Sequence, residues 1–154
     1  MNQRAPLLSW DLYIESYRRK MLLLGSLQKL KKFAQQKDWK VEWDFERQLL
    51  VHQKIILVTD VAQTIRYASE NLVSMNGYTP SEVIGKSPRM FQGDATPADT
   101  RNEIREAIIR RIPFHGSIVN YRKDGTPYDC FVDEYPVWSK GGELVNFIAF
   151  EKVA

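Results

Sequence analysis

The chain has 154 residues, of which 44% are hydrophobic and 27% are charged, and its net charge at pH 7 is +3. This composition is typical of a folded globular protein with one core, and it excludes a disordered or fibrous protein. The longest apolar run near the start, residues 21–24, is too short to cross a bilayer and too late for a secretory signal, so no membrane segment is expected. Cys130 has no second cysteine to pair with, so a cytoplasmic location is predicted.

Residues 9–36 show the spacing of an amphipathic helix. One stripe of apolar side chains recurs every three or four residues: Leu7, Trp10, Ile14, Tyr17, Met21 and Leu24. A second, slightly rotated stripe contains Leu23, Leu27, Leu30 and Ala34. Ser9 is the predicted N-cap, and Gly25 with Ser26 is a predicted kink or break. A helix this apolar has to pack on the following domain or on a second copy, and we predict a homodimer through it.

The positive charge is concentrated at the start of the chain. Residues 1–40 carry nine basic and three acidic side chains, whereas the other 114 residues carry thirteen basic and sixteen acidic ones. A basic segment can attract nucleic acid, and the set available here is Arg18, Arg19, Lys20, Lys29, Lys31 and Lys32. These residues alternate with apolar ones, which indicates the solvated face of a helix, so a nucleic-acid partner is not expected. Trp10, Trp39 and Trp43 are predicted to pack between this helix and the rest of the domain.

Beyond residue 40 the pattern becomes mostly that of strands and short helices. The predicted elements, in order, are a hairpin over 51–60 and 62–69, helical turns over 70–75 and 81–84, a helix over 97–111, and strands over 114–122, 127–138 and 143–152. Successive hairpins indicate an antiparallel sheet with its helices on one face, which is an α+β fold. We therefore divide the chain into an N-terminal amphipathic helix, residues 1–40, and a sheet-containing domain, residues 41–154.

Four motifs occur in the same order as in a known family. They are YASENLVSMNGYTPSEVIGKSPRMFQG at 67–93, NEIREAI at 102–108, GSIVNYRKDGTPYDCFV at 116–132 and LVNFIAF at 144–150. With the order of the elements, they make residues 50–154 resemble the PAS sensor family. The resemblance implies a five-stranded antiparallel sheet that encloses a pocket beneath short helices. It also implies a domain that senses a small molecule, light or redox state and that dimerises through a flanking helix.

Residues 85–96, GKSPRMFQGDAT, are most similar to the flavin-binding light-oxygen-voltage (LOV) branch of that family. The branch has Asn-Cys-Arg-Phe-Leu-Gln-Gly where this chain has SPRMFQG at 87–93. Pro88 stands in place of the photoactive cysteine. Proline has no nucleophilic atom, so cysteine–flavin adduct chemistry cannot occur there.

The resemblance also implies candidate pocket residues. Arg89 and Gln92 match flavin contacts of the LOV branch, Asn120 matches a contact to the pyrimidine edge, and Arg105 matches the second phosphate-binding arginine. Two guanidinium groups suit the phosphate of flavin mononucleotide (FMN), because each can donate two hydrogen bonds to it.

Three other pocket positions depart from the branch. Ser87 replaces an asparagine, Cys130 replaces the second pyrimidine-binding asparagine, and Glu151 replaces the glutamine near flavin N5. An ionised glutamate cannot donate a hydrogen bond to the flavin, and burial without a partner would raise its pKa. The cofactor therefore stays open among three alternatives, which are no cofactor, another small ligand, and FMN or another flavin.

No metal, haem or nucleotide site is predicted. His52 and His115 are far apart in sequence, His115 is predicted to be a strand-edge residue, and helix 97–111 contains no histidine for a haem. Gly85-Lys86-Ser87 resembles the end of a phosphate-binding loop, but Pro80 stands where that motif needs its first glycine.

No catalytic site is predicted either. Cys130 is expected to be a small buried residue on a strand. Glu134 and Glu151 share its strand face, so paired carboxylates are an alternative, although solvated glutamates are the favoured interpretation.

We therefore predict a non-catalytic PAS-type sensory and interaction module. It would bind a small ligand or a partner protein and signal through its N-terminal helix. The alternatives are a cofactor-free dimerisation scaffold and a flavin-binding LOV-like redox or light sensor without cysteine adduct chemistry. The sequence shows no kinase, helix-turn-helix or cyclase pattern, so the module is expected to act through another protein or within a longer chain.

Overall fold

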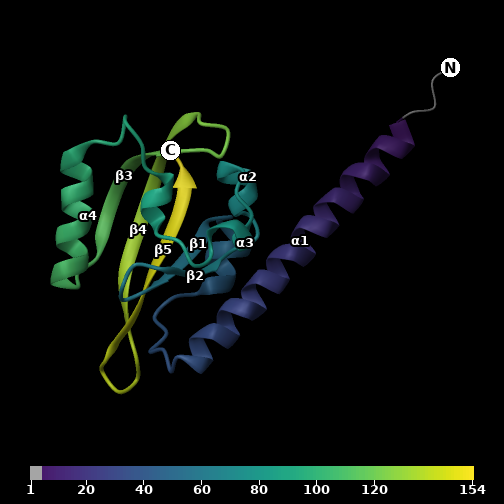
Figure 1. The fold of residues 1–154 in the computed structure, drawn as a ribbon. Helices are drawn as coiled ribbons and strands as arrows, with labels where there is room; N and C mark the ends of the chain where they lie inside the picture. Colours follow the sequence, from purple (N-terminus) through teal and green to yellow (C-terminus); the bar gives the residue numbers. More distant parts are fainter. Residues whose placement is uncertain (1–4) are drawn as a thin grey trace.

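The computed structural model describes residues 5–154, with side chains from Ser9 onward, and contains one five-stranded sheet (Figure 1). The elements, in order, are α1 (Ala5–Gln36), the π-helical turn η1 (Arg47–Val51), β1 (Ile55–Asp60), β2 (Ile65–Ala68), α2 (Leu72–Asn76), α3 (Pro80–Val83), the 3-10 turn η2 (Pro88–Phe91), α4 (Ala98–Arg110), β3 (Phe114–Tyr121), β4 (Pro127–Trp138) and β5 (Leu144–Val153). The strand order is β2-β1-β5-β4-β3, and all neighbouring strands are antiparallel. The predicted α+β fold is confirmed.

The first hairpin is shorter than predicted. Val51 ends the turn η1 instead of starting a strand, because the backbone N–H of Lys54 donates to the carbonyl of Gln48 at 3.0 Å. At the other end, the Asp60 side chain accepts hydrogen bonds from the backbone N–H groups of Ala62 and Thr64, each at 3.0 Å. These bonds close a loop before β2, which therefore begins at residue 65.

The sheet separates two apolar layers. The inner layer lies between the sheet and the short helices and contains Ile55, Leu57, Ile65, Ala68, Leu72, Met75, Val83, Phe91, Ala107, Phe114, Ile118, Tyr128, Cys130 and Val132. The outer layer lies between the sheet and α1 and contains Leu23, Leu27, Leu30, Ala34, Trp39, Phe45, Leu49, Ile56, Val58, Tyr67, Val137, Ile148 and Phe150. Side chains of one strand alternate between the two layers, because successive residues point to opposite faces.

Helix α1 is continuous from Ala5 to Gln36. The predicted N-cap at Ser9 and the predicted break at Gly25 and Ser26 are therefore both wrong. Contacts with the domain hold the helix together at the expected break. The Ser26 hydroxyl accepts from the backbone N–H of Glu70 at 2.9 Å, and the Ser26 carbonyl accepts from the Tyr67 hydroxyl at 2.7 Å. A single glycine costs a helix only about 1 kcal/mol, which such contacts offset.

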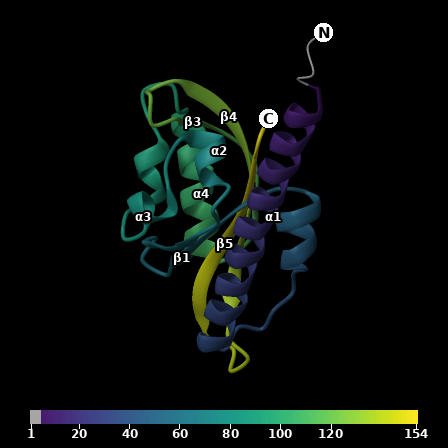
Figure 2. The ribbon, with the colours of Figure 1, turned by 90° about the vertical axis from the view of Figure 1, so that its right-hand side faces the viewer.

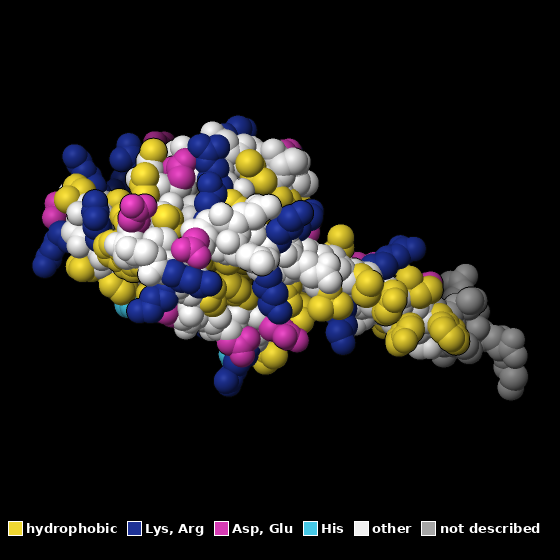
Figure 3. Space-filling view, turned by 90° about the horizontal axis from the view of Figure 1, so that it is seen from below, with side chains coloured by type: hydrophobic (Ala, Val, Ile, Leu, Met, Phe, Trp, Pro, Cys, Tyr) yellow, Lys and Arg dark blue, Asp and Glu magenta, His cyan; other side chains and the backbone are white. Residues whose placement is uncertain are grey.

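The two halves of α1 have different surroundings. The C-terminal half lies along the outer face of the sheet, whereas the N-terminal half projects beyond the domain (Figures 1 and 2). The second predicted stripe, which starts at Leu23, is buried as expected. In the first stripe the exposed fractions are 64% for Trp10, 42% for Ile14, 56% for Tyr17 and 49% for Met21. Leu24, at the end of this stripe, is half-buried, and the side chain of Leu7 lies outside the described part of the structure. Hydrophobic side chains accordingly gather along the projecting part of the molecule (Figure 3).

The tryptophans are only partly where the sequence predicts them. Trp39 is buried between the end of α1 and the sheet, and its indole N–H donates to Asn146 Oδ1 at 2.8 Å. Trp43 is half-buried against Tyr135 and Phe150 of the outer face. Trp10 lies on the projecting half of α1 and does not pack on the sheet, so that part of the prediction is wrong.

The stretch GKSPRMFQGDAT links α3 to α4 through η2. Gly85 has a φ of 87°, a left-handed conformation that favours glycine. The Ser87 hydroxyl accepts from the backbone N–H of Arg89 at 3.3 Å and so caps the turn. A Cβ at Gly93 would lie 2.5 Å from Tyr121 Cε2, so this glycine lets the Tyr121 ring pack against the loop. The stretch is first of all a packed connection between helices.

Candidate functional site

A small pocket lies between the inner face of the sheet and the turns above it. Its volume is about 80 Å³. The lining residues come from β1, the loop after it, η2, α4, β3, β4 and β5: Leu57, Thr59, Gln63, Pro88, Phe91, Gln92, Ile104, Ile108, Ile118, Asn120, Val132, Glu134, Phe147, Ala149 and Glu151. Pockets for drug-sized ligands usually measure about 300–1,000 Å³, so this pocket suits a group of only a few atoms.

The structure brings together some of the predicted pocket residues and leaves out others. Gln92, Asn120 and Glu151 line the pocket. Arg89 on η2 and Arg105 on α4 are exposed and do not line it. The two guanidinium groups thus lie outside the pocket, and its polar lining consists of amide, hydroxyl and carboxyl groups.

Cys130 lies beside the pocket and contacts one of its carboxyl groups. Its thiol is buried and lies 3.6 Å from Glu151 Oε2, to which it donates. Burial, with the charge of Glu151 as the second cause, raises the pKa of the Cys130 thiol well above its ordinary value. The thiol therefore stays protonated, which agrees with the predicted role of Cys130 as a small buried residue.

Two carboxyl groups, Glu134 and Glu151, line the pocket from adjacent strands. Glu151 on β5 pairs with Val132 on β4, and Glu134 on β4 pairs with Ala149 on β5, so the two glutamates are diagonal neighbours. Glu151 is buried and Glu134 is half-buried. The favoured interpretation of solvated glutamates is therefore wrong, because the strand register places both side chains inside.

Burial changes the ionisation of this carboxyl pair. It raises the pKa of Glu134 to about 7. Burial also raises the pKa of Glu151 to about 7, and the nearby charge of Glu134 acts in the same direction, while the Cys130 thiol opposes it. Both groups consequently change protonation near neutral pH.

Sequence reasoning missed two polar residues of the pocket, Thr59 and Gln63. Thr59 is 5% exposed, and its hydroxyl finds no hydrogen-bond partner among the described residues. The Nε2 atom of Gln63 is likewise buried without a partner in the described part of the chain. Buried polar atoms normally have partners, so these two atoms in the pocket wall are available to a water molecule or a ligand. The signal in the sequence was the polar end of an otherwise apolar strand.

This set of residues does not fit a flavin. The volume of about 80 Å³ lies far below that of a pocket for a tricyclic ring. Glu151 faces the place where the LOV resemblance puts a glutamine, and Glu134 adds a second carboxyl group to the lining. Neither glutamate can donate a hydrogen bond to a flavin acceptor once it is ionised. A flavin is therefore not a ligand that this pocket fits.

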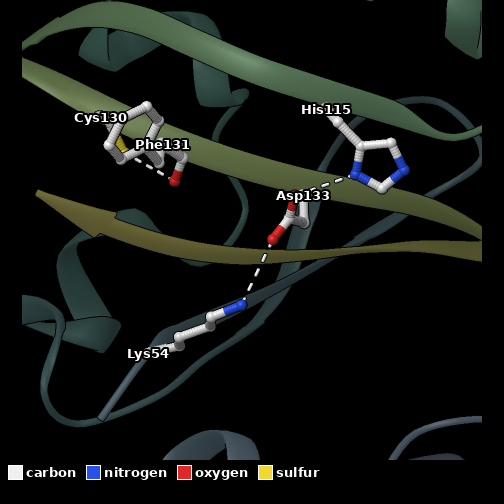
Figure 4. Close-up of polar contacts among 5 residues, drawn as sticks. All are labelled: Lys54, His115, Cys130, Phe131 and Asp133. Atoms are coloured by element: carbon white, nitrogen blue, oxygen red, sulfur yellow. Dashed lines mark hydrogen bonds and ion pairs between the residues drawn. The ribbon is translucent and has the colours of Figure 1, made fainter. Parts of the chain in front are cut away.

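The opposite face of the sheet carries an ion-paired cluster. Lys54 and His115 both contact Asp133 of β4, at 3.3 Å and 2.9 Å (Figure 4). Burial opposes ionisation of Asp133, but hydrogen bonds from His115 and Lys54 hold its pKa below the ordinary value. His115 is exposed on the edge strand β3, as predicted.

No group of three or more His, Cys, Asp or Glu side chains within residues 5–154 is placed to hold a metal ion. In the same range no helix combines the length and the apolar character that a membrane span requires.

Comparison with known proteins gives consistent matches. Residues 53–152 match the family model of the PAS domain. The chain is 35% identical over 102 residues to phototropin-2 of Oryza sativa subsp. japonica, and this alignment covers 64% of the chain and 11% of phototropin-2. The chain spans about a tenth of the length of this and of the other phototropins it matches.

Solved structures of LOV domains are similar as well. The light state of the aureochrome1 LOV domain has a TM-score of 0.64 at 25% identity, covering 70% of this chain and 87% of that one. The light-state dimer of the fungal photoreceptor Vivid has a TM-score of 0.61 at 27% identity, covering 64% and 76%.

Proposed function

The chain belongs to the PAS domain family and has LOV-domain homologues, and on that premise we propose that it is a non-catalytic sensory module. A small ligand in the inner pocket would change the packing of the sheet, and α1 would pass the change to a second copy or a partner protein. The division of the chain at residue 40 and the cytoplasmic location stay predictions.

One observation supports this proposal above the others: strand β5 forms part of both the pocket and the surface that holds α1. Ala149 and Glu151 line the pocket, whereas Ile148 and Phe150 belong to the outer layer beneath α1. A shift of β5 that accommodates a ligand on one face therefore alters the packing on the other.

A buried hydrogen-bond chain joins the same two regions. Thr59 lines the pocket, and its carbonyl accepts from Asn146 Nδ2 at 2.9 Å. Asn146 Oδ1 in turn accepts from the indole of Trp39, just after the end of α1, at 2.8 Å. The pocket and α1 are thus linked by apolar packing and by polar contacts. Both kinds of contact can couple a change in the pocket to the position of the helix.

The projecting half of α1 is suited to a second copy of the chain. Its exposed stripe, Trp10, Ile14, Tyr17 and Met21, follows a 4–3–4 spacing, which is the spacing of a helix-pairing seam. A single apolar helix is marginal in water and needs such a partner. The related photoreceptor Vivid forms a light-state dimer, which supports a dimer here too.

The sequence of this stripe favours an antiparallel pair of helices. A two-fold axis between residues 15 and 16 places Trp10 opposite Met21 and Ile14 opposite Tyr17 of the other copy. The same axis brings Asp11 beside the basic residues 18–20 of the partner. A parallel pair would instead bring the two basic runs together, and like charges repel.

We expect Ile14→Asp to weaken self-association by at least about tenfold, because it places a charge in the centre of the seam. Sedimentation velocity on the full chain measures this change. Ser16→Asp adds the same charge two residues away, off the stripe, and should leave the association constant within about twofold. Equal effects of the two variants would contradict a seam through Ile14.

Spin labels test the orientation of the helices in the dimer. In a Cys130→Ala background, labels at position 16 should lie close together, since packed helix axes are about 8–10 Å apart. Labels at position 32 should be separated by about 50 Å along the helix axis, because each residue adds about 1.5 Å. Short distances at both positions would show a parallel pair.

A further inference from the structure

The charged groups that line the inner pocket are all acidic. Glu134 and Glu151 line it, and no lysine, arginine or histidine does. Neither glutamate forms an ion pair with a described residue, and Glu151 accepts a hydrogen bond from the neutral thiol of Cys130. Buried carboxylates that are ionised are normally paired with a cation, and the structure supplies no cationic side chain to the ionised form of this pair.

A second observation points to a ligand at the same place. The Thr59 hydroxyl is buried, lines the pocket and finds no partner among the described residues, although a hydroxyl both donates and accepts. An N–H group in the pocket could therefore donate to Thr59 Oγ1 as well as to the carboxylates. The unsatisfied hydroxyl and the unpaired carboxyl groups call for the same kind of partner.

The remaining walls limit the size and shape of that partner. Phe91, Ile104, Ile118 and Phe147 supply apolar surface around the polar groups. The volume of about 80 Å³ admits only a few non-hydrogen atoms. A planar group with two N–H donors on one edge suits a carboxylate, because it can form two parallel hydrogen bonds to it.

We propose that the inner pocket binds a small organic cation with N–H donors, of the amidinium or guanidinium class, held by Glu151, Glu134 and Thr59. This inference rests on the proposed sensory function, because it names the ligand class of the same pocket. It also accounts for the misfit with flavin, since the substitution that removes a flavin contact, Glu151, supplies a partner for a cation.

The protonation of the pocket makes binding depend on pH. The titratable groups that face Glu151 are Glu134, Cys130 and Tyr128, and the pKa of each is raised by burial. The two carboxyl groups are mostly protonated below neutral pH and ionise above it, so a cation should bind more tightly as the pH rises through about 7.

Three probes of one shape test the proposal on the full chain. Acetamidinium, acetamide and acetate have the same skeleton but are cationic, neutral and anionic. At about pH 8, acetamidinium should raise the midpoint of thermal unfolding in a saturable manner, whereas the other two should not. Its affinity should fall about tenfold at about pH 6, where the carboxyl groups are mostly protonated. Tetramethylammonium, which has no N–H donor, should have no effect.

Variants connect the effect to the pocket. Glu151→Gln should weaken acetamidinium binding by at least about tenfold, because it removes a charged acceptor. Glu134→Gln provides the same test should the first variant fold poorly, and near-ultraviolet circular dichroism reports folding. Glu143→Gln, at an exposed turn, is the matched control and should bind like the unchanged chain.

The outcomes separate this inference from the proposed function. Equal effects of acetamidinium and acetamide, no binding of acetamidinium, or full binding by the glutamine variants would each overturn the cation site. Saturable binding of acetate or acetamide alone would overturn it while leaving a ligand-binding sensory pocket in place. The sensory function itself is tested by the response of α1 to a filled pocket, a measurement that needs no ligand.

Discussion

Replacing Trp39 by alanine should lower the free energy of unfolding by about 3–5 kcal/mol, the usual cost of removing a large buried aromatic side chain. Trp39 is 2% exposed and packs edge-on against Phe33 and Phe45. Its loss also leaves Asn146 Oδ1 without its donor inside the outer layer. Because these contacts connect the end of α1 to the sheet, the C-terminal half of the helix should lose hydrogen-exchange protection as well.

Trp10→Ala is the matched control for this experiment. The chemical change is the same, but Trp10 is 64% exposed on the projecting half of α1. At protein concentrations where the chain is monomeric, the free energy of unfolding in urea should differ from that of the unchanged chain by no more than about 0.5 kcal/mol. The two roles assigned to these tryptophans would be wrong if both variants lost similar stability.

Stability should decrease as the pH rises from about 4.5 through about 7, because of Glu134 and Glu151. The pKa of each is about 7 in the folded protein and 4.5 at its ordinary value. In this interval the folded state therefore binds protons that the unfolded state has released. The stabilising contribution is complete below the lower pKa and is lost as the pH passes the higher one.

The double variant Glu134→Gln, Glu151→Gln should remove most of this pH dependence. One pKa unit corresponds to about 1.4 kcal/mol. Between about pH 5 and about pH 8 the free energy of unfolding of the unchanged chain should therefore fall by about 3 kcal/mol or more relative to that of the variant. Chemical unfolding at a series of pH values measures it. Groups with lowered pKa values, such as Asp60 and Asp133, titrate below this interval and do not interfere. If the free energies of unfolding of the two proteins depended on pH in the same way, the two glutamates would have to be exposed to water in the folded state.

Much of the fold could be predicted because local pattern and final structure agree. The strand β4 has the predicted bounds, since turn residues on both sides fix its ends. The buried stripe from Leu23 to Ala34 was predictable from its helical spacing. The continuity of α1 through Gly25 was not predictable, because it is stabilised by contacts with residues that are distant in sequence, such as Tyr67. The start of the helix was not predicted correctly either.

The pocket was harder to predict than the fold. The motif resemblance pointed to Gln92, Asn120 and Glu151, and all three line the pocket. It could not show that Arg89 and Arg105 point elsewhere, since that depends on how η2 and α4 sit over the sheet. The burial of Glu134 depends on strand register, and a shift of one residue would have placed it in water. Thr59 was missed because only tertiary structure shows that its hydroxyl lacks a partner.

Filling the pocket and measuring dimerisation tests the sensory account most directly. Ala149→Leu places a larger side chain in the pocket from β5, whose other face lies beneath α1. For a variant that keeps the native near-ultraviolet spectrum, the account predicts a change of about fivefold or more in the self-association constant. A constant equal to that of the unchanged chain would contradict coupling between pocket and helix, and would identify the domain as a dimerisation scaffold.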